Sequence, residues 1–271
     1  MPELPEVETI RRCISPEIVG QTVTKVIVRN ASLRWPVPAE LVRSLPNQRI
    51  DAVDRRAKYL VIRTDAGSAI IHLGMSGKLL VCPQDKSVEK HDHLDLAFNN
   101  GKVLRFNDPR RFGCALWTSE DPARHPLLAS LGKEPLEDGL TGEYLFDQSR
   151  GRSLRIKEFL MNNRVVVGVG NIYANESLFA AGIHPGRAAG RISLTRYKRL
   201  NAAIKKVLAD AVRQGGTTLR DFCDAAGNPG YFQLSLMVYD RAGLPCHSCG
   251  SIIQRIRIGQ RSTYFCKKCQ R

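Results

Sequence analysis

The sequence of 271 residues predicts an α+β protein with more than one domain. Short strand-like runs fill most of the first 118 residues, apolar residues recur at helical spacing from about residue 153, and four cysteines form two close pairs near the C-terminus. A chain of this length can bury a substantial core. We therefore expect a strand-rich N-terminal domain, a helical domain and a small metal-binding hairpin.

The first segment of the chain reads as an amphipathic helix that ends before Pro16. Pro5 suits the first turn of a helix, and acidic residues in that turn favour the positive end of the helix dipole. The apolar face is expected from three residues at helical spacing, Val7, Ile10 and Ile14. A plain helix with an acidic start is the simplest interpretation of this segment.

The same terminus carries groups that could perform chemistry. Removal of Met1 would leave Pro2 with a secondary amine next to the carboxylate of Glu3. An α-amino group has a pKa of about 7.7–8.0, against about 10.4 for lysine, so more of it is neutral and nucleophilic near pH 7. Composition alone favours the simple helix start over a nucleophile.

Strand patterns dominate the sequence up to about residue 118. Asn100-Gly101 is a strong hairpin turn between the alternating run 93–98 and the run 103–106. Strands at this spacing, with only one helix expected among them at Ala39–Ser44, predict a sandwich or a barrel. The other expected strands are 21–30, 49–54, 58–64, 68–73 and 78–82.

The second half of the chain changes from strand to helix patterns. Residues 119–150 are rich in Pro, Gly and acidic residues, and we expect a linker at 134–150. Three helices are expected, at 154–161, at 173–181 and from Ser193 to the stop at Gly215-Gly216. The domains would then span 1–133, 151–236 and 237–271.

Positive charge is confined to one part of the chain. Residues 1–149 contain 20 Lys+Arg and 20 Asp+Glu, whereas residues 150–271 contain 21 Lys+Arg and 6 Asp+Glu, which accounts for the net charge of +15. Such a field suits a polyanion such as nucleic acid, with a solvated basic surface as the alternative. An anionic membrane ranks lowest. Without a long apolar run or a signal-peptide layout, the protein is expected to be soluble and cytoplasmic.

The paired cysteines predict a metal site. Cys246, Cys249, Cys266 and Cys269 follow the pattern C-x2-C-x16-C-x2-C, which lies within the spacing range of four-thiolate zinc sites. Four protein ligands leave no position for water, so the zinc would be structural. Disulfides and a redox pair are alternatives that a reducing compartment and the doubled motif disfavour. Residues 241–271 contain seven Lys+Arg and no carboxylate, which suits phosphate.

Three glycine-containing segments are further candidates for DNA binding. Gly168-Val169-Gly170-Asn171 could hold an anion at a helix entrance, although a tight turn explains it as well. In the segment 107–113, Arg110 and Phe112 could wedge into a duplex, but a surface turn with Phe112 in the core is the plainer interpretation. Met75 in 72–77 could be exposed by a sharp reversal, but by default it fills a gap in the core.

Together these motifs resemble the formamidopyrimidine-DNA glycosylases, bifunctional repair enzymes for oxidised purines. The matching segments, in family order, are PELPEVET at the terminus, RRAKYL at 55–60, HLGMSG at 72–77, KHDH at 90–93, DPRRFG at 108–113, VGVGNIYANE at 167–176, QGGTTL at 214–219 and the cysteine pairs. The resemblance implies an N-terminal β-sandwich with flanking helices, a helix–two-turn–helix domain with a lesion loop at about 217–231, and a zinc-finger β-hairpin. The implied partner is damaged double-stranded DNA, bound by a monomer.

The resemblance also implies roles for single residues. Pro2 would be the nucleophile and Glu3 its acid/base partner, while Lys58 and Arg261 would hold phosphates at the catalytic site. Met75, Arg110 and Phe112 would fill the void in the duplex. The other DNA contacts would be His72, His91, Asn171 and Tyr239. The lesion pocket would include Glu6, Thr217, Thr218 and Arg220, the last standing where a lysine is expected.

The predicted activity is a DNA glycosylase with apurinic/apyrimidinic lyase activity. It would flip and excise 8-oxoguanine and formamidopyrimidines through a Pro2 Schiff base and then cleave the abasic site by β,δ-elimination. One structural Zn²⁺ and no redox or catalytic cofactor are expected. The protein is expected in a bacterial cytoplasm, associated with the nucleoid when it is bound to DNA. The alternatives are the sister group endonuclease VIII, which prefers oxidised pyrimidines, and a non-catalytic zinc-containing DNA-binding protein.

Overall fold

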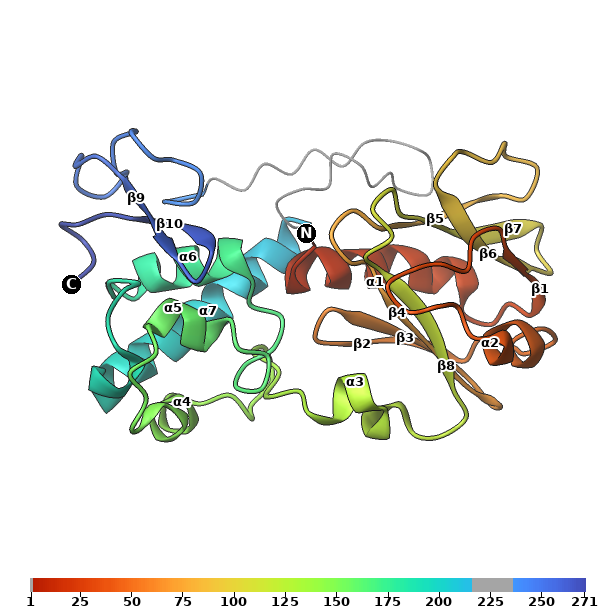
Figure 1. Ribbon diagram of the computed structural model, residues 1–271, viewed down its shortest axis with the longest axis horizontal. Helices are drawn as coiled ribbons and strands as arrows, with labels where there is room; N and C mark the ends of the chain where they lie inside the picture. Colours follow the sequence, from red (N-terminus) through yellow and green to blue (C-terminus); the bar gives the residue numbers. More distant parts are fainter. Residues whose placement is uncertain (1, 216–235) are drawn as a thin grey trace. The chain divides into compact units, whose positions relative to one another are not determined.

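The computed structural model describes residues 2–215 and 236–271, which fall into two compact units. The first unit contains residues 2–130 and Gly215, and the second contains residues 131–214 together with the C-terminal residues 236–271. Figure 1 traces the order of the elements within each unit. The predicted α+β class is confirmed.

The first unit is a sandwich of two antiparallel four-stranded sheets. One sheet has the order β1-β6-β7-β5 and the other the order β2-β3-β4-β8. The strands are β1 (Val23–Val28), β2 (Ala52–Arg56), β3 (Tyr59–Thr64), β4 (Gly67–His72), β5 (Lys78–Pro83), β6 (Asp92–Phe98), β7 (Lys102–Asn107) and β8 (Cys114–Thr118). The predicted hairpin at Asn100-Gly101 joins β6 to β7, and Gly101 has the positive φ of +76° that such a turn requires.

Four helical segments accompany the sheets. They are α1 (Leu4–Ile18), α2 (Ala39–Ser44), the 3₁₀ turn η1 (Pro122–Arg124) and α3 (Pro126–Ala129). Apolar residues of α1 and of both sheets form one continuous core, to which α1 contributes Val7, Ile10, Ile14 and Ile18. The sandwich that the family resemblance implied is therefore present.

The first helix is longer than expected. It was predicted to end before Pro16, but it runs to Ile18 with Pro16 inside it. A proline in a helix removes one backbone hydrogen bond. Ile14 and Ile18 are 3% and 0% exposed on either side of it, so burial of this last turn against the sheets outweighs the missing bond.

The second unit is helical and ends in a two-stranded hairpin. Its elements are α4 (Gly142–Ser149), α5 (Ile156–Leu160), α6 (Asn171–Ala180), the 3₁₀ turn η2 (Ala189–Arg191), α7 (Leu194–Arg213), β9 (Gln254–Ile258) and β10 (Arg261–Phe265). The predicted N-cap Ser193 accepts a hydrogen bond from the backbone N–H of Arg196, at 3.4 Å. Tyr173 of α6 and Tyr197 of α7 are both fully buried in the helical core.

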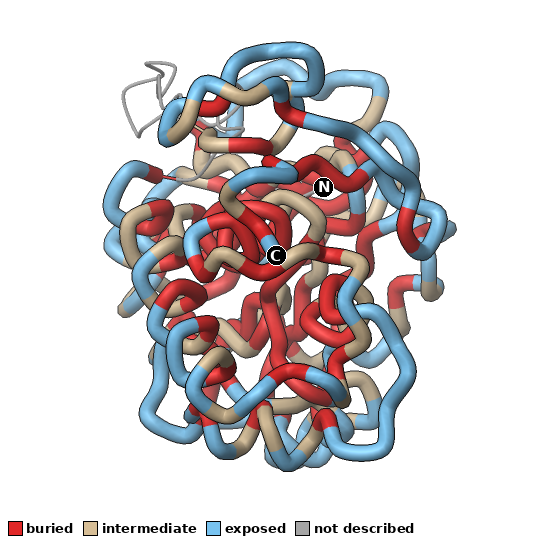
Figure 2. Tube along the Cα trace, turned by 90° about the vertical axis from the view of Figure 1, so that its left-hand side faces the viewer, coloured by how far each residue is buried: buried red, intermediate tan, exposed pale blue. Residues whose placement is uncertain are grey.

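The segment 134–150 is not the linker that its composition suggested. It contains α4, which packs against α7, and its residues Leu140 and Leu145 are fully buried in the helical core. Two buried leucines were too few to produce a visible helical period in the sequence. Figure 2 shows buried stretches of this kind alternating with exposed loops along the trace.

None of the helices formed by the described residues combines the length and apolarity that crossing a membrane requires.

Candidate nucleic-acid interface and zinc site

The start of α1 places two buried carboxylates next to Pro2. Glu3 and Glu6 are only 2% and 1% exposed, whereas Pro2 is half-buried. The backbone N–H of Glu3 donates to Oε2 of Glu6 at 2.8 Å, as part of a capping box at the helix N-terminus. Helix capping therefore explains why these two acids can lie inside the protein and why their positions are fixed.

Glu8 ties this helix to the sheet beneath it. Its carboxylate accepts hydrogen bonds from Arg11 at 2.8 and 3.0 Å, from Arg12 at 2.9 Å and from Arg55 of β2 at 3.1 Å. Burial alone would raise the pKa of Glu8, but the arginine hydrogen bonds and charges outweigh it and lower the pKa to about 2. Glu8 is thus ionised across the physiological range and holds the start of α1 in place.

His72 lies at the end of β4, opposite Tyr59, and the two ring centroids are 4.7 Å apart. Burial lowers the pKa of His72 to about 4, and the charges of Lys58 and Arg34 act in the same direction. Its Nδ1 accepts the backbone N–H of Gly74 at 3.0 Å, so the proton of the neutral ring is on Nε2. His72 can therefore offer a phosphate an uncharged N–H donor.

Met75, Arg110 and Phe112, predicted to fill the void in the duplex, are called the wedge, and its two apolar side chains are exposed. Met75 and Phe112 are each 43% exposed, so neither fills the core as the plainer interpretation of the sequence had it. The guanidinium carbon of Arg110 lies 4.7 Å from the centre of the Phe112 ring, within the range of a cation–π contact. An exposed pair of apolar side chains beside a cation suits insertion between DNA bases.

The buried carboxylate of Asp108 holds the two loops of the wedge together. It accepts a hydrogen bond from the hydroxyl of Ser76 at 2.7 Å and one from the backbone N–H of Gly113 at 2.8 Å. Gly74 has φ of +62°, and a Cβ atom there would lie 2.4 Å from the backbone of Phe112. This close approach requires glycine. The predicted contact His91 adjoins these loops, because its carbonyl accepts the backbone N–H of Asp108 at 3.0 Å.

A pocket of about 710 Å³ brings four predicted site residues of the first unit together. They are His72, Met75, Arg110 and Phe112. The pocket is also lined by Gly74 and Arg111, which belong to the two predicted segments, and by residues that the sequence analysis missed, namely Ser32, Leu33 and Arg34.

Arg34 is the most informative of the missed residues. Its guanidinium lies 4.6 Å from the centre of the Trp35 ring, and its backbone N–H donates to the carbonyl of Gly113 at 3.1 Å. Within the described ranges, Arg34, Arg110 and Arg111 form no ion pair with a carboxylate. The adjacent Arg-Trp pair was the available signal, since cation and aromatic side chains often occur together at nucleic-acid sites.

The second unit carries three predicted DNA contacts. Asn171 is the first residue of α6, its N-cap is Gly170, and its buried Oδ1 accepts no hydrogen bond from the described residues. Arg261 is exposed at the start of β10. Tyr239 is half-buried, with its ring centroid 5.1 Å from that of Tyr264. Thr217, Thr218 and Arg220 lie outside the described residues.

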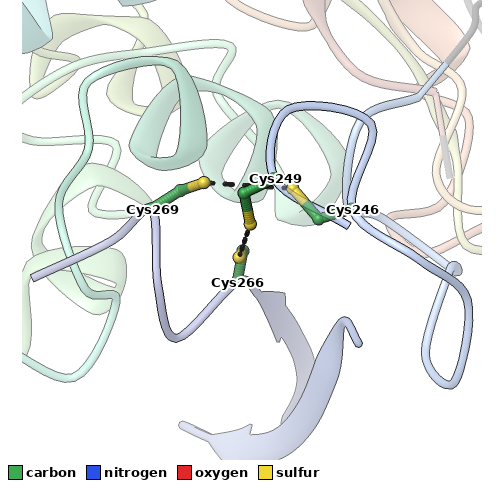
Figure 3. A group of neighbouring side chains, drawn as sticks. All are labelled: Cys246, Cys249, Cys266 and Cys269. Atoms are coloured by element: carbon green, nitrogen blue, oxygen red, sulfur yellow. Dashed lines mark hydrogen bonds between the residues drawn. The ribbon is translucent and has the colours of Figure 1, made fainter. Parts of the chain in front are cut away.

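The four predicted zinc ligands converge in the second unit (Figure 3). The Sγ atoms of Cys246, Cys249, Cys266 and Cys269 all lie within 4.8 Å of one another. Cys249 and Cys266 are 3.4 Å apart, and Cys246 and Cys269 are 4.0 Å apart. Zn–S bonds of about 2.3 Å in a tetrahedron put the sulfur atoms roughly 3.8 Å apart. The set therefore fits one structural zinc ion, which the four thiolates would hold between the two C-x2-C turns.

Comparison with known proteins agrees with this arrangement along the whole chain. The model of the formamidopyrimidine-DNA glycosylase N-terminal domain matches residues 1–115, and that of the H2TH domain of the same family matches residues 131–223. A zinc finger found in FPG and IleRS matches residues 243–271.

Individual relatives match at full length. The formamidopyrimidine-DNA glycosylases of Stenotrophomonas maltophilia (strain R551-3) and Methylococcus capsulatus are 58% and 56% identical over 271 residues, which covers 100% of each chain. A Lactococcus lactis FPG variant solved with DNA containing Fapy-dG has a TM-score of 0.91 at 32% identity and full coverage of both chains. FPG from Thermus thermophilus has a TM-score of 0.87 at 36% identity, covering 99% of this chain and 98% of its own. The protein belongs to the formamidopyrimidine-DNA glycosylase family.

Proposed function

We propose that this DNA glycosylase excises oxidised purines from duplex DNA through a covalent bond to Pro2 and then cleaves the resulting abasic site. The observation that carries the proposal is the capping box that fixes the buried acids Glu3 and Glu6 beside Pro2. Relatives support the substrate class, since Lactococcus lactis Fpg has been solved with Fapy-dG DNA and with abasic-site DNA. A further neighbour was solved with DNA containing carbocyclic 8-oxo-G.

The first chemical stage replaces the base by the protein. With Met1 removed, the neutral amine of Pro2 attacks C1′, and the glycosidic electron pair leaves with the base, which gains a proton. Glu3 protonates the ring oxygen, so that the C1′–O4′ bond opens and the nitrogen lone pair forms an iminium. A secondary amine gives a cationic iminium without further protonation.

The second stage cleaves the DNA strand on both sides. The iminium accepts the electron pair left when a C2′ proton is removed, and the 3′ phosphate departs as the C2′–C3′ double bond forms. Loss of a C4′ proton then expels the 5′ phosphate, and water releases the remaining sugar fragment and regenerates the amine. This stage consists of proton transfers, two eliminations and a final hydrolysis, and none of these steps needs an oxidant or a reductant.

The other site residues would hold the flipped nucleotide. We assign phosphate contacts to Lys58, His72, Asn171, Tyr239 and Arg261, with His91 as a further DNA contact. Met75, Arg110 and Phe112 would occupy the space that the base leaves, which offsets part of the cost of a few kcal/mol for unstacking. Glu6, Thr217, Thr218 and Arg220 are assigned to the lesion pocket. The zinc ion would stabilise the fold that carries Arg261.

Borohydride trapping on abasic-site DNA tests the nucleophile. The wild-type protein should form a covalent protein–DNA adduct, because reduction of the iminium fixes the bond to Pro2. A Pro2→Gly variant should trap and cleave far less, and intact-mass analysis of the same samples reports whether Met1 has been removed. Full trapping and cleavage by Pro2→Gly, or no trapping by processed wild type, contradicts the mechanism.

Incision of defined duplexes tests the substrate class. Oligonucleotides that each contain one oxidised purine or one oxidised pyrimidine, opposite each of the four bases, should show faster excision of the purine lesions. A consistent preference for oxidised pyrimidines would favour the endonuclease VIII alternative.

A further inference from the structure

We propose that Asn175 is a positioning residue for DNA binding, which fixes the first residue of α6 relative to the start of β10. These two places carry Asn171 and Arg261, so the inference rests on the phosphate contacts assigned to them in the proposed function. The sequence analysis gave no role to Asn175. It lies in the middle of α6, inside the second unit, and is 1% exposed.

The side-chain amide of Asn175 bridges the two elements. Its Nδ2 donates to the carbonyl of Asn171, one turn earlier in the helix, at 2.6 Å. Its Oδ1 accepts the backbone N–H of Tyr264 in β10 at 2.9 Å. The opposite orientation of the amide would bring a carbonyl oxygen against an oxygen and an N–H against an N–H, so the two contacts determine how the group is turned.

The bond to Tyr264 satisfies an open strand edge. Strand β10 pairs with β9 on one side only, so its other edge would leave backbone groups without partners. Lys157 contacts the same edge two residues before Tyr264. Its Nζ donates to the carbonyl of Ser262 at 2.9 Å and to the hydroxyl of Thr263 at 2.7 Å. Ser262 and Tyr264 are two residues apart, so Lys157 and Asn175 contact the same edge of β10.

The neighbouring Glu176 secures the chain that leads into the zinc-binding region. Its carboxylate accepts the three consecutive backbone N–H groups of Met237, Val238 and Tyr239, at 2.9, 3.0 and 2.8 Å. Glu176 therefore anchors the entry to this region, whereas Asn175 anchors the strand on which Arg261 lies. Among the hydrogen bonds between described residues, those of Asn175 connect that strand directly to Asn171.

The geometry explains why loss of this bridge would act on Arg261. Arg261 is three residues before Tyr264, which is roughly 10 Å along a strand. The side chain at Arg261 is exposed and has no ion pair within the described part of the chain, so its place is set by the backbone of the hairpin. Release of the Tyr264 edge would let the hairpin shift relative to α6, and Arg261 would lose its register with the phosphate held at Asn171.

The test measures how much Arg261 contributes to the salt dependence of DNA binding in different backgrounds. The ligand is a duplex with a non-cleavable abasic analogue, and fluorescence anisotropy gives the binding constant at several NaCl concentrations. One phosphate contact changes the slope of log K against log[NaCl] by about 0.9. The contribution of Arg261 is the slope difference between each background and the same background with R261A.

We expect a difference of about 0.9 in the wild type and in the N163A control, whose exposed asparagine belongs to the same unit. In N175A the difference should fall close to zero. N175D keeps an oxygen for the Tyr264 N–H but loses the donor to the Asn171 carbonyl, so it should retain more of the difference than N175A and less than the wild type; the added charge cancels because it is present in both members of the pair. If N175A loses its zinc, N175S replaces it, since a serine hydroxyl can reach the Asn171 carbonyl but not Tyr264.

The outcomes distinguish a failure of the positioning role of Asn175 from a failure of the proposed phosphate contact by Arg261. An undiminished Arg261 contribution in zinc-loaded N175A or N175S would overturn the positioning role and leave the phosphate contact intact. No effect of R261A in the wild type would overturn both the phosphate contact and the inference. A contribution lost equally in N163A would show a general loss of structure and would also refute a role specific to Asn175.

Discussion

Replacement of Glu8 by glutamine should destabilise the first unit by about 3 kcal/mol at neutral pH. The pKa of Glu8 falls from 4.5 to about 2 in the folded protein, because arginine hydrogen bonds and charges outweigh the burial that would raise it. Each pKa unit corresponds to about 1.4 kcal/mol. The Glu8 and Arg55 side chains are each 11% exposed, so the substitution would also remove the charge of a carboxylate that contacts a nearly buried guanidinium.

The pH dependence of this effect has a definite sign. A carboxylate with a lowered pKa stabilises the folded state fully above its unfolded pKa, and the stabilisation is lost as the pH falls towards the folded pKa. The difference between wild type and E8Q should therefore be about 3 kcal/mol at pH 7 and only about 1 kcal/mol at pH 3.

Urea denaturation followed by tryptophan fluorescence can measure this difference. The protein has two tryptophans, Trp35 and Trp117, and both belong to the first unit, so their emission reports the unfolding of that unit. E17Q is a matched control on the same helix, because Glu17 pairs with Lys102 at a more exposed position and should matter by less than about 1 kcal/mol. An E8Q protein as stable as wild type at pH 7, or a difference that does not shrink at pH 3, would refute the electrostatic account.

Three further predictions concern the wedge, the pocket and the metal. R34A should reduce the slope of log K against log[NaCl] for DNA binding by about 0.9. The control R43A, on the exposed side of α2, should leave the slope unchanged, and equal slopes for R34A and wild type would exclude a phosphate contact by Arg34. G74A should lower the free energy of unfolding by roughly 2–4 kcal/mol in the same urea assay, because φ of +62° and a Cβ 2.4 Å from the Phe112 backbone both oppose a side chain. A G74A protein as stable as wild type would show that the loops of Gly74 and Phe112 can separate. C249S should lose the single zinc ion in a colorimetric metal assay and with it DNA affinity, and retention of one zinc per chain would contradict a four-thiolate site.

Much of the fold follows from local sequence signals. Asn100-Gly101 fixes a hairpin because few residue pairs adopt its backbone conformation, and Ser193 begins α7 because its hydroxyl caps the helix. Pro16 misled the prediction, since the burial of Ile14 and Ile18 that keeps it inside α1 depends on strands distant in sequence. The helix α4 was missed for the same reason, because the burial of its residue Leu145 depends on residues distant in sequence, such as those of α7.

The site divides in a similar way. Cysteine spacing alone identified the zinc ligands, because two C-x2-C turns carry their geometry with them. The exposure of Met75 and Phe112 could not be read from composition, since apolar residues are usually buried and the contacts that fix these loops, such as those of Asp108, join residues distant in sequence. The bridge made by Asn175 joins residues 89 positions apart and leaves no local pattern.

The hydrogen bonds of Asp108 to both loops also affect how quickly the protein could search a genome. Because this carboxylate already holds both loops, Met75 and Phe112 stand ready without a folding step of their own. If the proposed function holds, each base pair that the protein passes contacts Met75 and Phe112 in their final positions. The dwell time at an intact pair would then depend on how readily the DNA opens, so damage that weakens stacking would stand out kinetically before any bond is broken.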